Sequence, residues 1–265
     1  MGVAYDRPEI SPESESIFMA RVPRWLLMVA MAGGGLTACH RDRAIAPTIT
    51  FFPLHAEDTW VYEVARPLRN QRSRMTVRAR GDQFIEVLHR HAHLVEESYG
   101  ADDENGGHPE TYPIAYYREN GFLYRALSLE YHDGKLRDVG LGSAEERFLP
   151  DTLSPDSTWE SLTTAYDLGP NDRYGVTQRH RAVLDPATIA VPAGQFSGCL
   201  RVDTVAIHRG QREAQPDDRP VVLYYADWYA PNVGLVRTVQ SSRADGGPAL
   251  AQIELLAYDV EGARR

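Results

Sequence analysis

The chain has 265 residues, of which 43% are hydrophobic and 25% are charged, and these proportions are typical of a globular protein. Its net charge of −9 at pH 7 argues against nucleic acid as a partner, because nucleic-acid binders need a basic surface that replaces the phosphate counterions. The two cysteines, Cys39 and Cys199, are too few for a small fold held together by disulfides.

The chain begins with a segment that we interpret as a targeting signal. Residues 1–18 are polar and precede Met19, so we expect translation to start at Met19 and residues 1–18 to be an upstream extension. Arg21 and Arg24 then precede an apolar run from Trp25 to Ala38, which is shorter than the roughly 20 residues of a membrane-spanning helix. This order of a basic and a short apolar region predicts a signal peptide over residues 19–38.

The signal peptide ends in Leu36-Thr37-Ala38-Cys39, which resembles the bacterial lipobox. The resemblance implies that Cys39 is acylated and becomes the mature N-terminus, with residues 39–50 as a lipidated tether. Two or three acyl chains hold a protein stably in a membrane leaflet. His40 stands where an aspartate marks inner-membrane retention, so we expect the outer membrane, with the domain facing the periplasm. The alternatives are a chance cysteine after an ordinary secretion signal and a short membrane anchor.

Residues 51–265 are predicted to form a single β-rich domain, because aromatic and β-branched residues alternate with polar ones over short stretches. The predicted strands are residues 59–64, 74–80, 83–88, 92–99, 114–118, 122–131, 176–184, 199–208, 221–229, 234–239 and 249–259. Asp133-Gly134 is a hairpin turn signal, and residues 101–110 and 210–220 form polar loops. The predicted fold is mostly β, an antiparallel sheet forming a half-barrel, barrel or sandwich with few helices.

Three segments together resemble a known group of proteins. They are FFPLHAEDTWVYEV at 51–64, VPAGQFSGCLRV at 191–202 and YYADWYAPNVGLVRTV at 224–239. They are similar to the DUF3108-like or TapB-like group of bacterial secreted proteins and lipoproteins, which is thought to relate to the curved sheets of lipoprotein carriers. The resemblance covers most of residues 51–265 and departs at Glu57-Asp58 and Asn232, where glycine is usual. The group has no established catalytic residues, so the resemblance implies none here.

The three segments also have a physical interpretation of their own. Phe52, Leu54 and Trp60 are expected to close one end of the sheet. Residues 191–194 (VPAG) and 231–234 (PNVG) are turn signals between strands, and we interpret them as structural corners.

Three histidines, His89, His91 and His93, alternate along one predicted strand and are the candidate metal ligands. Neighbouring alternate side chains lie about 7 Å apart on a strand, so one ion would not easily bind all three. A further ligand would have to come from elsewhere, such as Glu96 or His108. The simpler interpretation is a solvent-facing strand, and we expect no tight metal site and no cofactor.

No catalytic motif is apparent in the sequence. It contains no Gly-x-Ser-x-Gly, no phosphate-binding glycine loop and no His-Glu-x-x-His. Acidic pairs such as Asp102-Asp103 and Asp217-Asp218 lie in predicted loops, and Cys199 is expected to be a buried apolar residue. The aromatic residues Tyr224, Tyr225, Trp228 and Tyr229 could line a ligand groove, although packing in the core is the commoner role.

Two classes of function remain open. The first is a non-enzymatic, membrane-anchored envelope lipoprotein that binds a lipid, peptide, glycan or partner protein on a curved sheet. The second is an envelope hydrolase or metal-binding protein of a type without recognisable motifs. The missing catalytic motifs favour the first class, and a wide apolar concavity would support it further.

Overall fold

The structure is a computed structural model that describes residues 50–100, 110–126, 129–138, 146–166, 173–210 and 220–263. These residues all belong to one compact unit, Pro47–Arg265. The predicted signal peptide, Cys39 and nearly all of the tether lie outside the described residues, as do His108 and most of the two polar loops. Within the described part of the chain, no helix is long and apolar enough to cross a membrane.

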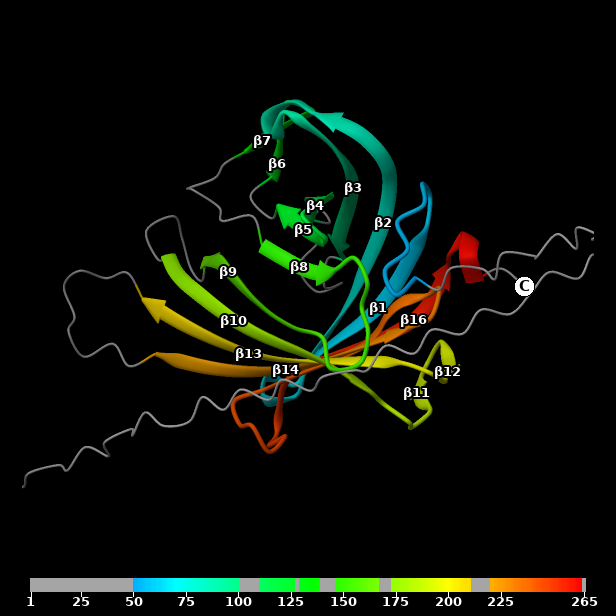
Figure 1. Ribbon diagram of the computed structural model, residues 1–265, viewed down its shortest axis with the longest axis vertical. Helices are drawn as coiled ribbons and strands as arrows, with labels where there is room; N and C mark the ends of the chain where they lie inside the picture. Colours follow the sequence, from blue (N-terminus) through cyan, green and yellow to red (C-terminus); the bar gives the residue numbers. More distant parts are fainter. Residues whose placement is uncertain are drawn as a thin grey trace, which may run out of the picture. The chain divides into compact units, whose positions relative to one another are not determined.

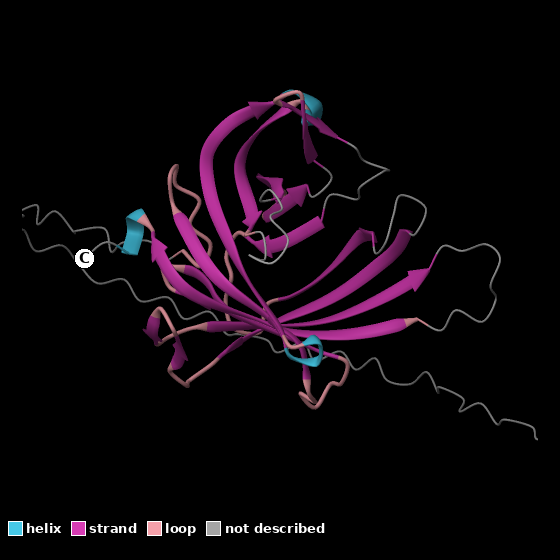
Figure 2. Ribbon diagram, turned by 180° about the vertical axis from the view of Figure 1, so that it is seen from behind, coloured by secondary structure: helices cyan, strands magenta, loops and turns pink. Residues whose placement is uncertain are grey.

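Antiparallel strands make up 70% of the structure (Figures 1 and 2). The main sheet contains β1 (Thr59–Arg66), β2 (Gln71–Ile85), β3 (Arg90–Tyr99), β4 (Glu110–Glu119), β5 (Phe122–Ala126), β8 (Glu146–Pro150), β9 (Thr158–Tyr166), β10 (Arg173–Leu184), β13 (Leu200–Gly210), β14 (Val221–Ala230), β15 (Gly234–Ser241) and β16 (Ala249–Asp259). Two hairpins stand apart, β6 (Leu129–His132) with β7 (Lys135–Asp138) and β11 (Ile189–Val191) with β12 (Gly194–Phe196). Three short 3₁₀ turns are η1 (Pro67–Arg69), η2 (Glu86–Leu88) and η3 (Glu261–Ala263).

The main sheet consists of two meanders, a first one of β1–β5 and β8 and a second one of β9, β10 and β13–β16. They meet through the first and last strands. Its order is β8-β5-β4-β3-β2-β1-β16-β15-β14-β13-β10-β9, so β1 pairs with β16 in the middle. The two outer strands, β8 and β9, contact each other, and the sheet is nearly closed into a barrel (Figure 1). The predicted fold class, a mostly β antiparallel sheet with few helices, is confirmed, and of the predicted half-barrel, barrel or sandwich the structure has the nearly closed barrel.

Some predicted elements differ from those in the structure. Residues 74–80 and 83–88 were expected as two strands, but β2 runs through Gly81 because a β-bulge between Ala79 and Gly81 absorbs the glycine. The strand ends at Ile85, and the last three residues predicted as strand form η2 from Glu86. The predicted strand 122–131 is divided between β5 of the main sheet and β6 of a hairpin. Sequence patterns did not indicate β8 or β9.

The turn predictions are confirmed. Asp133 and Gly134 have positive φ values of 51° and 73° and connect β6 to β7. Pro192 and Ala193 connect β11 to β12, and residues 231–233 connect β14 to β15.

Glu57 and Asn232, two of the positions where the resembled group carries glycine, have positive φ values of 70° and 59°. This is the backbone geometry that glycine adopts most easily. The neighbouring Asp58 is buried and accepts hydrogen bonds from the backbone N–H groups of His55 and Glu261, at 3.0 and 2.8 Å. Asp58 therefore ties the entry of β1 to the segment that follows β16.

The main hydrophobic core lies on the concave side of the sheet and draws on both meanders. Trp60 and Tyr62 come from β1, whereas Val202 and Leu255 come from β13 and β16. A smaller second cluster on β3–β5, including Ala92, Ala115 and Tyr117, is covered by the β6–β7 hairpin. The sheet thus encloses a core that neither meander could form alone.

Candidate functional site

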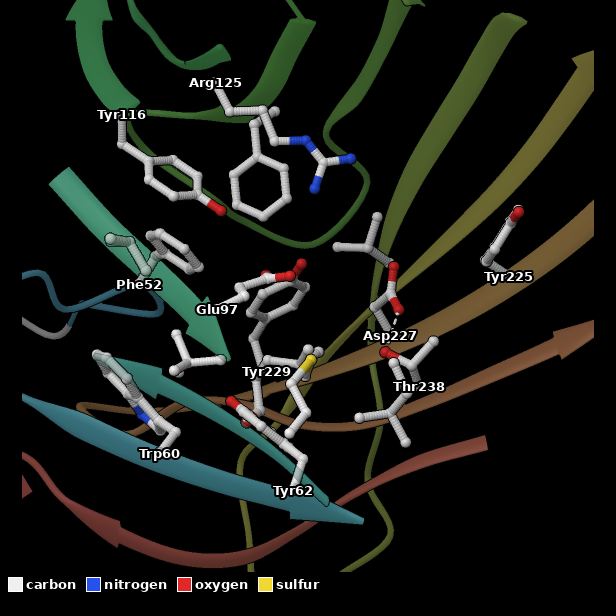
Figure 3. A pocket seen from close by; sticks show the side chains of 18 of the residues that line it. Phe52, Trp60, Tyr62, Glu97, Tyr116, Arg125, Tyr225, Asp227, Tyr229 and Thr238 are labelled. Atoms are coloured by element: carbon white, nitrogen blue, oxygen red, sulfur yellow. Dashed lines mark hydrogen bonds between the residues drawn. The ribbon is translucent and has the colours of Figure 1, made fainter. Parts of the chain in front are cut away.

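A cavity of about 330 Å³ remains inside the curved sheet, in the size range of small-molecule sites. Both meanders line it, because inward-facing side chains alternate along the strands of each. Aromatic rings form much of its wall, as Figure 3 shows for several of them. The aromatic lining residues are Phe52, Trp60, Tyr62, Tyr99, Tyr116, Phe148, Tyr225 and Tyr229.

The segment before β1 contributes part of this wall. The ring of Phe52 packs against the rings of Tyr116 and Phe148, at centroid distances of 5.1 and 5.0 Å. Trp60 donates a hydrogen bond from its indole N–H to the carbonyl of Val233 at 2.6 Å. Phe52, Leu54 and Trp60, which the sequence predicts at one end of the sheet, all line the cavity.

Strand β14 divides the aromatic stretch between its two faces. Tyr225 and Tyr229 face the cavity, and Asp227 lies between them on the same face (Figure 3). Trp228 does not line the cavity, and its indole N–H donates to Asp185 at 2.9 Å. The stretch therefore serves both of the roles that the sequence left open, a ligand-sized cavity and packing.

Arg125 on β5 is the cavity's cationic group among the described lining residues. Its guanidinium forms two hydrogen bonds with the carboxylate of Glu146 on β8, at 2.7 and 3.1 Å. The guanidinium also lies over the Phe148 ring, 4.7 Å from its centroid. A buried arginine needs a hydrogen-bonded anion beside it, because an unpaired charge is unfavourable away from water. The carboxylate of Glu146 is this partner.

Two other carboxylates face the cavity without a cation in salt-bridge contact among the described residues. Burial raises the pKa of Glu97, and the Tyr99 hydroxyl donates a long hydrogen bond of 3.4 Å to its carboxylate. Burial also raises the pKa of Asp227 to about 6, although Thr238 donates a hydrogen bond to it at 2.7 Å. Both groups pay a desolvation cost when they ionise.

His180 is the centre of a hydrogen-bonded chain at the second meander's side of the cavity. Its ring lies between the hydroxyl oxygens of Ser161, at 2.9 Å, and Thr204, at 2.8 Å, and stacks on Trp159. Burial lowers the pKa of His180 to about 4, so the ring is neutral at pH 7.

The proton positions in this chain follow from its acceptors. Ser161 donates its only hydroxyl proton to the side-chain oxygen of Gln178 at 3.0 Å. The Nε2 atom of His180 must then donate to Ser161, and its Nδ1 accepts from Thr204. In this arrangement the hydroxyl proton of Ser161 points to Gln178 and not to His180.

The tyrosine hydroxyls of the cavity remain protonated. Burial is the main cause that raises the pKa values of Tyr62, Tyr116 and Tyr229. Tyr62 donates to the carbonyl of Leu235 at 3.0 Å, and the Tyr225 hydroxyl accepts from Gln240 at 3.1 Å. The cavity thus combines aromatic walls with several polar groups that are held by hydrogen bonds.

The three candidate histidines do not form the arrangement expected from the sequence. His89 precedes β3 in a left-handed turn with φ of 51°, so it does not share the strand face with the other two. His91 is exposed and contacts the carboxylate of Asp82 at 3.1 Å, whereas His93 is half-buried. In the described parts of the chain, no group of three or more His, Cys, Asp or Glu side chains is placed to hold a metal ion.

Cys199 is a free thiol that is fully buried, and burial raises its pKa to about 11. Its expected role as a buried small residue agrees with this environment. The acidic pairs Asp102-Asp103 and Asp217-Asp218 lie outside the described residues.

Sequence analysis did not identify the polar residues of the cavity, although the spacing of two of them from tyrosines indicates their strand face. Asp227 stands in Tyr225-x-Asp227-x-Tyr229, and Glu97 precedes Tyr99 at the same spacing, so both share a strand face with aromatic residues. Glu146 had no such signal, because β8 was not predicted and its pairing with β5 depends on a distant contact.

Fold and cavity together define a class of protein, a strongly curved antiparallel sheet that encloses an aromatic cavity. Two solved structures share this fold. A lipoprotein candidate from Parabacteroides distasonis matches with a TM-score of 0.51 and 17% identity, over 80% of this chain and 99% of that one. A candidate exported protein with a YmcC-like fold from Bacteroides fragilis matches with a TM-score of 0.50 and 12% identity, over 80% of this chain and 100% of that one.

At these identities the likeness shows the fold alone. No family model matches the chain, and no curated protein matches it. The resemblance to the DUF3108-like group therefore stays a prediction.

Proposed function

We propose that the protein is a lipid-anchored component of the bacterial cell envelope that binds a small apolar or amphipathic ligand inside its curved sheet without catalysing a reaction. The observation that carries this proposal is the cavity of about 330 Å³, whose wall combines eight aromatic residues and several aliphatic ones with a set of charged and polar side chains. Such a lining is typical of sites that bury most of a small ligand.

The envelope location is supported by two independent features. Leu36-Thr37-Ala38-Cys39 has the order of a lipobox after a short basic and apolar segment. The two proteins that share the fold are described as a candidate lipoprotein and a candidate exported protein. Acylation at Cys39, and His40 after it, lead us to place the domain at the outer membrane on its periplasmic side.

The absence of an enzymatic role is part of the proposal. Arg125 is held by Glu146, and His180 is neutral and donates to Ser161. Groups held in such contacts are suited to shape and polarise a binding site. They are less suited to exchange protons with a substrate.

Ligand binding is tested with a neutral apolar dye, N-phenyl-1-naphthylamine, whose fluorescence rises in apolar surroundings. Val77 on β2 lines the cavity, so Val77→Phe is expected to fill part of it and to weaken dye binding about tenfold. The matched control is Val221→Phe, which adds the same ring at an exposed position of β14 and should leave dye binding unchanged. Circular dichroism confirms that each variant is folded.

The wild-type protein is expected to bind the dye saturably, with about one site per chain. Wild-type protein that fails to bind the dye, or two variants that bind equally well, would contradict the proposed cavity.

The anchor is tested separately by Cys39→Ala in the full chain. We expect the variant to lose labelling by metabolically supplied fatty acid and to leave the membrane fraction, because no thiol remains at the lipobox position. A variant that still incorporates label and stays with membranes would overturn the lipoprotein assignment.

A further inference from the structure

Among the described residues that line the cavity, acidic groups outnumber basic ones. Three carboxylates line it, those of Glu97, Glu146 and Asp227. Among the described lining residues they face one guanidinium, that of Arg125, and a neutral His180. Glu146 holds the guanidinium through two hydrogen bonds. Burial raises the pKa values of Glu97 and Asp227, and Arg125 lowers them only through its more distant charge. Glu97 and Asp227 remain as acceptors without a cation in contact.

A carboxylate without a cation in contact is unfavourable in a cavity that holds no ligand. A buried carboxylate that lacks a cation either stays protonated or loses the solvation free energy of its charged form. Tyr99 reaches Glu97 at a long distance of 3.4 Å, and Thr238 satisfies one oxygen of Asp227. A cation that entered the cavity could pair with the carboxylate oxygens that Tyr99 and Thr238 leave available.

The walls around these carboxylates suit the same kind of ligand. Tyr62, Tyr116 and Tyr229 surround the space into which Glu97 points, and Tyr225 lies near Asp227 on the other side (Figure 3). Aromatic faces attract organic cations and at the same time bury apolar carbon. The combination of acidic acceptors and aromatic walls is more selective than either feature alone.

We infer that the cavity selects ligands that carry a protonated amine or a quaternary ammonium group on a small apolar body, with Glu97 and Asp227 as the counter-charges and the tyrosine rings as walls. This inference rests on the proposed function, because it names the class of ligand that the same cavity binds. An anionic ligand, such as a fatty acid, is disfavoured, since it would meet two carboxylates and an arginine that is already paired.

The test compares three probes of the same length, octylammonium, 1-octanol and octanoate, each as a competitor of the neutral dye at pH 7.5. The wild-type protein is expected to bind octylammonium about tenfold more tightly than octanol, and octanoate least well. In the double variant Glu97→Gln and Asp227→Asn, the advantage of octylammonium over octanol should disappear. Octanol and the dye should still bind, because the aromatic walls are unchanged.

A matched control removes the same charge from the surface. Glu160→Gln with Asp156→Asn changes two exposed carboxylates and should keep the preference of the wild type. If this control loses the preference as well, general attraction to an acidic protein explains it and the inference is overturned.

The remaining outcomes separate the inference from the proposed function. Binding of octanol and dye without a preference for octylammonium overturns the ligand class and leaves the binding function intact. Failure of all three probes and of the dye overturns both. A tighter complex with octanoate assigns the cavity to anionic ligands and also overturns the inference.

Discussion

At the residue scale, Asp227 and His180 titrate over nearly the same pH range with opposite effects on stability. Asp227 has its pKa raised from 3.8 to about 6, so between these values the folded state holds a proton that the unfolded state has released. Its contribution to the free energy of unfolding therefore falls as pH rises. His180 has its pKa lowered from 6.5 to about 4, so the unfolded state holds the extra proton and stability rises with pH.

Replacing Asp227 by asparagine removes its titration, so the difference between the variant and wild type isolates the effect of Asp227 from that of His180. Asparagine keeps the shape and can still accept the hydrogen bond from Thr238. The free energy of unfolding of Asp227→Asn, relative to wild type, is expected to rise by about 2 to 3 kcal/mol between pH 3.5 and pH 7.5. Urea unfolding at a series of pH values measures this difference.

The control for this prediction is Asp245→Asn, which removes an exposed carboxylate and should give a smaller change with pH. A constant difference between Asp227→Asn and wild type across the pH series would show that Asp227 titrates normally in the folded protein.

At the element scale, a single glycine allows β2 to run as one strand of 15 residues. Gly81 has φ of +82°, and a Cβ built there would lie 3.0 Å from the Cβ of Ala56. The bulge beside it lets the strand bend strongly over the cavity, as β2 does in Figure 1. Gly81 is therefore part of the curvature that creates the site.

Gly81→Ala is expected to lower the free energy of unfolding by about 1 to 3 kcal/mol, because alanine is strained at this φ and crowds Ala56. Gly175→Ala on β10 is the matched control, since its added Cβ meets no atom within 4 Å and its φ is not in the left-handed region. The two variants are compared by urea unfolding. Equal stability of both would mean that the bulge relaxes without cost.

The same glycine shows how far sequence patterns could define the elements. Alternation identified most long strands, and the bounds of 249–259 agree with β16. Gly81-Asp82 was interpreted as the end of a strand, because a local pattern does not distinguish a turn from a bulge whose partner strand holds the chain in register. The short strand β8 was missed because its definition depends on pairing with β5 more than on its own composition.

At the scale of the whole molecule, the cavity exists only because distant parts of the chain meet. β1 pairs with β16, and the lining residues come from β1–β5 and β8 as well as from β10 and β13–β16. Sequence analysis could therefore predict a curved sheet and propose some aromatic residues, such as Tyr225, as lining. It could not bring Glu97 and Arg125 together with Asp227, because their proximity follows from the closure of the sheet.

This shared interior predicts that the protein from His40 onward unfolds in one cooperative transition. The main core includes Trp60 of the first meander and Val202 and Leu255 of the second, so unfolding of either half would expose the apolar surface of the other. One half should then have no stable folded state while the other is unfolded. The expected result is that a single urea midpoint describes both halves.

Tryptophan fluorescence can report on each half separately. Trp60 lies in β1, whereas Trp159 and Trp228 lie in β9 and β14. A variant with Trp159→Phe and Trp228→Phe reports on the first meander, and Trp60→Phe reports on the second. In each variant the fluorescence midpoint should coincide with that variant's own midpoint by far-ultraviolet circular dichroism, even where the substitution lowers both. Separate midpoints within one variant would show that the two meanders fold as independent units, and a cavity built from both would then open whenever the weaker one unfolds.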